Sequence, residues 1–103
     1  MRAPIFTVST EDAKMLDSLV LDYICTAYGS AKHRRSEPTI NAADVADYIA
    51  QHGRCPASVR GVKRWTYSAC YSSLQRLTRA QLLETSLALV NGQETRCYNP
   101  VGA

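Results

Sequence analysis

Apolar residues recur at helical spacing near the start of the chain. Ser9 and Thr10 are hydroxyl N-cap candidates, and the acids that follow them favour the positive end of a helix dipole. An apolar face of about three turns comes next, and Gly29 provides a stop. The pattern predicts a first helix over residues 10–29 whose buried face holds Leu16, Leu19, Val20, Tyr23, Ile24 and Ala27.

A second helix is predicted over residues 41–52. Asn41 and Asp44 have the spacing of a capping box, in which each side chain accepts from the other residue's backbone N–H. Gly53 is placed to end the helix. Its apolar positions are Val45, Ala46, Ile49 and Ala50.

A third helix is predicted over residues 66–80. Thr66 is a good N-cap, and Trp65 before it can pack on Cys70 as a hydrophobic staple. Cys70, Leu74 and Leu77 form the apolar stripe. An exposed helix face ordinarily carries strong helix formers such as Ala, Glu and Lys, but the opposite face here carries hydroxyl, amide and guanidinium groups. It carries Tyr67, Ser68, Tyr71, Ser72, Gln75, Arg76 and Arg79.

A β-hairpin is predicted over residues 82–99, because Asn91-Gly92 between two extended runs supplies the positive φ angles that its turn requires. Leu83, Thr85, Leu87 and Leu89 share one face of the first strand, and Cys97 or Tyr98 is the expected core contact of the second. Residues 1–103 therefore form one mainly α domain with a β-hairpin, of the α+β class.

Positive charge is concentrated in the middle of the chain. The formal net charge is +3, yet residues 48–83 contain six Lys or Arg and no acid, which leaves −3 for the remainder. Such asymmetry is typical of a surface that binds nucleic acid. A lopsided solvated surface is the alternative.

Other chemistries find little support. The four cysteines and two histidines do not form a zinc motif, so we expect no metal. Cys25 and Cys70 fall on apolar stripes and are expected to be buried, and disulfides are left open. No catalytic motif, cofactor loop, signal peptide or membrane-spanning run is present. We therefore expect a cytoplasmic protein that is not an enzyme and has no cofactor.

The order of these elements resembles the winged helix-turn-helix family of DNA-binding domains over residues 39–98. INAADVADYIA resembles its first helix, YSACYSSLQRL its recognition helix, and QLLETSLALVNGQETRCYNP its wing. The chain departs from the family in two places. Gln81 replaces the usual glycine, so the third helix is expected to end without the residue favoured at a left-handed cap, and the link from Gly53 to Trp65 is longer than a simple turn.

The resemblance implies a transcriptional regulator that inserts its third helix into the major groove of double-stranded DNA. Gln75 would pair with adenine, and Arg76 with guanine or phosphate. The other expected DNA contacts, mostly to phosphate and sugar, are Arg60, Lys63, Arg64, Tyr67, Ser68, Tyr71, Ser72, Arg79 and, from the wing, Arg96.

Two alternatives accompany this reading. A winged helix can serve protein contact within an assembly, and exposed aliphatic or acidic residues on the third helix would favour that use. The apolar residues Met15, Leu16, Leu19 and Tyr23 either form a homodimer surface on the first helix or complete the core of the monomer. No small-molecule effector site is evident.

Overall fold

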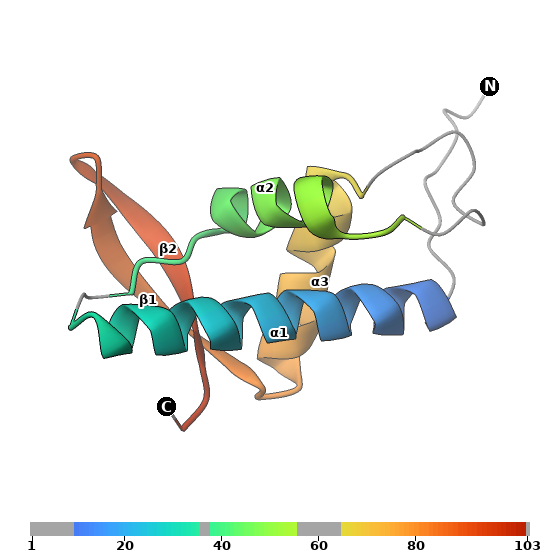
Figure 1. Ribbon diagram of the computed structural model, residues 1–103, viewed down its shortest axis with the longest axis horizontal. Helices are drawn as coiled ribbons and strands as arrows, with labels where there is room; N and C mark the ends of the chain where they lie inside the picture. The colour runs from blue at the N-terminus through green and yellow to red at the C-terminus, as the bar shows by residue number, and fades with distance from the viewer. Residues whose placement is uncertain (1–9, 36–37, 56–64, 103) are drawn as a thin grey trace.

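The computed structural model describes residues 10–35, 38–55 and 65–102. Three helices, α1 (Thr10–His33), α2 (Ala42–His52) and α3 (Tyr67–Arg79), precede an antiparallel hairpin of β1 (Leu83–Val90) and β2 (Gln93–Pro100) (Figure 1). The predicted α+β class and the order of elements are confirmed. α3 packs against both α1 and α2, and the hairpin lies at one end of the helical layer (Figure 1).

Helix α1 extends beyond its predicted end. Gly29 was expected to terminate it, but the helix continues to His33. A glycine inside a helix costs only about 1 kcal/mol relative to alanine, which tertiary packing can offset. Ala31, beyond the glycine, is buried, so the added turn contributes to packing. Arg35, with a φ of 57°, follows the helix in the left-handed conformation.

The predicted N-caps of α2 and α3 are confirmed. The backbone N–H of Asp44 donates to Asn41 Oδ1 at 2.9 Å, and that of Asn41 donates to Asp44 Oδ2 at 3.2 Å. At the start of α3, the N–H of Ala69 donates to Thr66 Oγ1 at 3.2 Å. These side chains satisfy N–H groups that have no partner within the helix.

Helix α3 closes without the glycine that is usual at its end. Gln81 itself adopts the left-handed conformation, with a φ of 62°, that glycine would otherwise supply. The N–H of Leu82 donates to the carbonyl of Leu77 at 3.0 Å, and that of Gln81 donates to Thr78 at 3.1 Å. These two hydrogen bonds define a Schellman motif, so the helix closes normally around an unfavourable residue.

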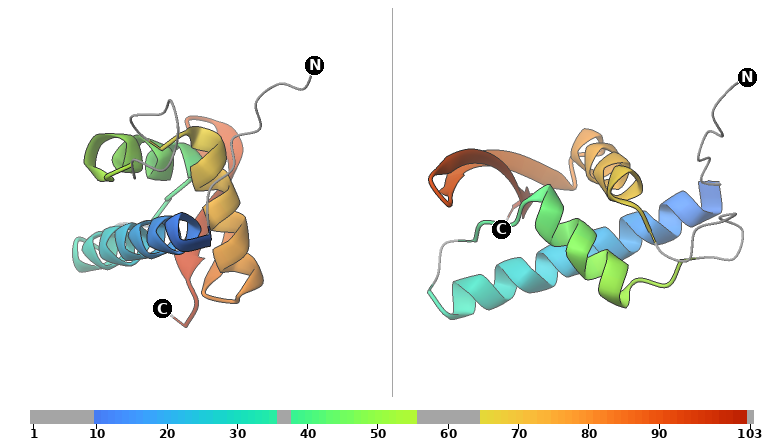
Figure 2. Two further views of the ribbon diagram at one scale, coloured as in Figure 1. Left: turned by 90° about the vertical axis from the view of Figure 1, so that its right-hand side faces the viewer. Right: turned by 90° about the horizontal axis from the view of Figure 1, so that it is seen from above.

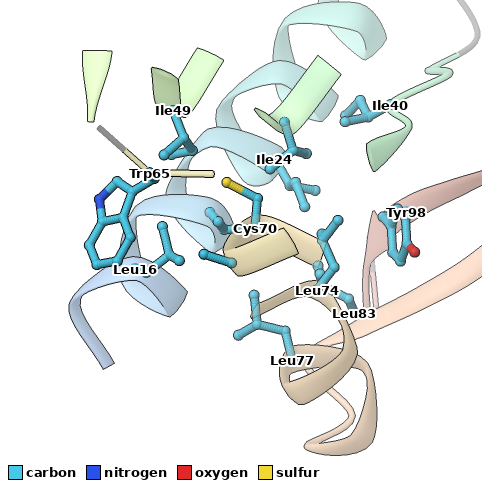
Figure 3. Close-up of a cluster of buried hydrophobic side chains, with 13 residues drawn as sticks. Leu16, Ile24, Ile40, Ile49, Trp65, Cys70, Leu74, Leu77, Leu83 and Tyr98 are labelled. Atoms are coloured by element: carbon cyan, nitrogen blue, oxygen red, sulfur yellow. The ribbon is translucent and has the colours of Figure 1, made fainter. Parts of the chain in front are cut away.

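The hydrophobic core joins all three helices to the base of the hairpin (Figure 3). Cys70 is buried at its centre as predicted, whereas Cys25 is exposed, so the burial predicted for Cys25 is wrong. Helix α1 carries Cys25 outside the face that Leu16, Val20 and Ile24 bury. The core comprises Leu16, Val20, Ile24, Ile40, Val45, Ile49, Trp65, Ala69, Cys70, Leu74, Leu77, Leu83 and Tyr98.

The hairpin turns at the predicted dipeptide. Asn91 and Gly92 have φ angles of 52° and 80°, and Val90 pairs with Gln93 beside them. Cys97 and Tyr98 are both buried. The N–H of Tyr98 donates to the carbonyl of Ile40 at 2.8 Å. This bond anchors the outer edge of β2 to the segment that leads into α2.

Candidate nucleic-acid interface

One side of the molecule is formed by α3 and the hairpin together (Figure 2). Within α3 no residue is acidic. Six of its side chains are exposed and form what we term the polar face of α3. They are Tyr67, Ser68, Tyr71, Ser72, Gln75 and Arg79. All six were candidate DNA contacts, and the structure brings them together on one surface.

Arg76 lies beside the polar face and turns toward α1. Its Nε and Nη2 atoms donate to the Asp17 carboxylate, with distances between 2.8 and 3.2 Å. The fully buried hydroxyl of Ser73 donates to the same carboxylate at 2.5 Å. The Arg76 side chain remains 39% exposed. The structure therefore places Arg76 at the seam between α1 and α3, with one edge of its guanidinium already paired.

The partnership of Asp17 was not anticipated from the sequence. Asp17 lies off the apolar stripe of its helix, and 59 residues separate it from Arg76. No local spacing signals a contact at that separation. The contact arises because α3 crosses α1, so that the face of α3 that carries Ser73 meets α1.

A groove of about 610 Å³ lies between the start of α3, the start of α2 and the hairpin. The rings of Tyr67 and Tyr71 lie nearly parallel on its helical side, with centroids 6.4 Å apart. Arg96 lines this groove and also a neighbouring hollow of about 180 Å³ that Gln75 and Arg79 border. Glu94 contributes one acidic group to the hairpin side of the groove.

Tyr98 forms part of the floor of both hollows. Burial is the main cause that raises the pKa of its phenol, and nearby tyrosines add to the effect. The phenol therefore keeps its proton at neutral pH. Together with Arg96 it gives the groove hydrogen-bond donors suited to anionic or acceptor-bearing ligands.

Three of the candidate contacts, Arg60, Lys63 and Arg64, lie outside the described residues. The described chain nevertheless ties together the two ends of the segment that contains them, because the indole Nε1 of Trp65 donates to the carbonyl of Arg54 at 3.1 Å. Arg54, itself exposed, follows α2, and Trp65 is buried at the start of α3.

The candidate dimer surface on α1 is largely used within the chain. Leu16 is fully buried in the core, and Leu19 and Tyr23 pack against the core. Tyr23 also stacks on Tyr48 of α2, with ring centroids 4.3 Å apart. Met15 remains exposed. Leu16 therefore serves the core of the monomer and is not available for contact with a second chain.

Among residues 10–35, 38–55 and 65–102, no cluster of three or more acidic, His or Cys side chains could hold a metal ion. No helix in these ranges is long and apolar enough to cross a membrane. Comparison with known proteins identifies no relative: no family model, curated protein or solved structure matches the chain.

Proposed function

We propose that this chain is a winged helix-turn-helix domain that binds double-stranded DNA in a sequence-specific manner and acts as a small transcriptional regulator. The observation that carries the proposal is the polar face of α3, an acid-free helical surface with no described segment lying over it. The hairpin lies alongside it (Figure 2), and Arg96 of the hairpin borders the same hollow as Gln75 and Arg79. A major groove admits one α-helix, and a neighbouring ribbon can then follow the backbone.

Gln75 is the best placed residue for base recognition. It is exposed on the polar face of α3 and has no hydrogen-bond partner among the described residues. Its amide can both donate to and accept from an adenine edge. Arg79 and Arg96, near the adjoining hollow, would bind phosphate, and Ser68 and Ser72 would add hydrogen bonds to the backbone.

Arg76 takes a different role in this proposal. Asp17 accepts hydrogen bonds from its Nε and Nη2 atoms, so a bidentate pair with guanine through that edge would have to break the ion pair. Its Nη1 atom has no partner among the described residues, and it would bind a phosphate at the border of the DNA major groove. Base discrimination then falls to Gln75 rather than to Arg76.

Fluorescence anisotropy of labelled duplex DNA at increasing salt tests the proposal. Each phosphate contact adds about −0.9 to the slope of log affinity against log salt. Arg79→Ala and Arg96→Ala should each remove one phosphate contact and make the slope less negative by about 0.9. Lys14→Ala removes an equal charge from an exposed position on α1 and should leave the slope unchanged. Duplex selection with Gln75→Ala should lose preference for one adenine position.

The second candidate function is protein contact, which the hairpin favours. Leu87 and Leu89 of the hairpin are 64% and 76% exposed, whereas the polar face of α3 exposes no aliphatic residue. Absence of duplex binding at low salt, or binding that does not change with salt, would contradict DNA recognition and leave this alternative.

A further inference from the structure

Strand β1 presents an open edge. Tyr98 directs its N–H away from β1, toward Ile40, so Tyr98 and its cross-strand partner Thr85 form a non-hydrogen-bonded pair. Because pairs alternate along an antiparallel ladder, the backbone groups of Thr85, Leu87 and Leu89 all point outward from the hairpin. Among the described residues, no strand pairs with this edge of β1.

The side chains on this edge do not protect it. Edge strands usually avoid association through lysine, proline or bulges. β1 has none of these, and its sequence LETSLALV carries a single charge, Glu84. Leu87 and Leu89 stand exposed on one face of the same strand. This edge therefore offers unpaired backbone donors and acceptors beside two exposed leucines. Another β-strand could pair with the backbone groups and cover the leucines.

We propose that this partner is β1 of a second copy, paired antiparallel about a two-fold axis through Leu87. The outward-facing residues are the odd-numbered ones, so they must oppose odd-numbered residues of the second copy. An axis at Leu87 sets residues 84–90 opposite residues 84–90. Leu87 then opposes itself, and Leu89 opposes Thr85 of the second copy. The two hairpins become a four-stranded sheet.

This register avoids repulsion between like charges and pairs side chains of similar size. Glu84 lies opposite Val90 of the second copy, so the acid of β1 does not face its own equivalent. Ala88 lies opposite Ser86, a pair of small side chains. The leucines of both copies gather at the centre of one face, and Arg96, the cross-strand neighbour of Leu87, flanks them. The same strand sequence thus supplies both halves of the contact, as an isologous interface requires.

Paired cysteine variants test the register. In a Cys25→Ser background, Leu87→Cys places two thiols on residues whose Cα atoms are about 5.5 Å apart, within the range of a disulfide. Leu89→Cys is the matched control on the same face. In the proposed dimer the two residues at position 89 are four residues apart along the strands, or about 13 Å, which is too far for a disulfide. Oxidation should give a covalent dimer with Leu87→Cys and not with Leu89→Cys or the background chain.

Sedimentation without DNA tests association itself, independently of the proposed DNA binding. The wild-type chain should form a dimer as its concentration rises, and Leu87→Lys should remain monomeric at tenfold higher concentration. Leu82→Lys, at an exposed leucine outside β1, should still dimerise. A monomer throughout, or a dimer that Leu87→Lys does not weaken, overturns the proposal. Preferential cross-linking of Leu89→Cys overturns the register.

Discussion

Gln81 should limit the stability of the domain. A residue with a side chain in the left-handed conformation loses about 1–2 kcal/mol, which glycine avoids. Glycine in turn loses about 0.5–1 kcal/mol more backbone entropy on folding. Gln81 is exposed, so its replacement sacrifices no buried packing. Gln81→Gly should therefore raise the free energy of unfolding by about 0.5–1 kcal/mol.

Urea unfolding followed by circular dichroism measures this gain directly. In thermal unfolding it corresponds to about 2–8 °C for a domain of this size. Ala80→Gly is the matched control, because Ala80 is exposed and has a right-handed φ of −76°. Glycine at position 80 has the same entropy cost but relieves no left-handed strain, so Ala80→Gly should be destabilised. If both glycine variants lose stability equally, the left-handed strain at Gln81 is refuted.

Two further predictions follow from buried groups. Asp17→Ala should destabilise the domain by about 1–3 kcal/mol, because it leaves the buried hydroxyl of Ser73 without its acceptor. A double-mutant cycle with Ser73→Ala should show a coupling energy between the two residues. Strictly additive losses of stability would contradict the contact. Burial raises the pKa of the Cys70 thiol to about 11, so at pH 8 Cys70 should react with a disulfide reagent only as fast as the chain unfolds, whereas exposed Cys25 reacts at once. The folded state holds the Cys70 proton more tightly, so this thiol should lower stability as the pH rises from 9 toward 11.

Local signals predicted most of the backbone because their causes are local. The capping box at Asn41 and the turn at Asn91-Gly92 satisfy backbone groups only a few residues away. Helix ends were less predictable. Gly29 and Gln81 each oppose the local conformational preference, and packing beyond them outweighs a cost of about 1–2 kcal/mol.

Local patterns along the chain were enough to predict the three helices, the hairpin and the residues on the polar face of α3. Three features depend on how the elements pack: Arg76 turns from this face to Asp17, Leu16 is buried in the core, and Leu87 and Leu89 of β1 remain exposed. The two sets of features differ in the range of the interactions that produce them. Periodicity and capping act within a few residues, whereas ion pairs and burial depend on how one helix crosses another.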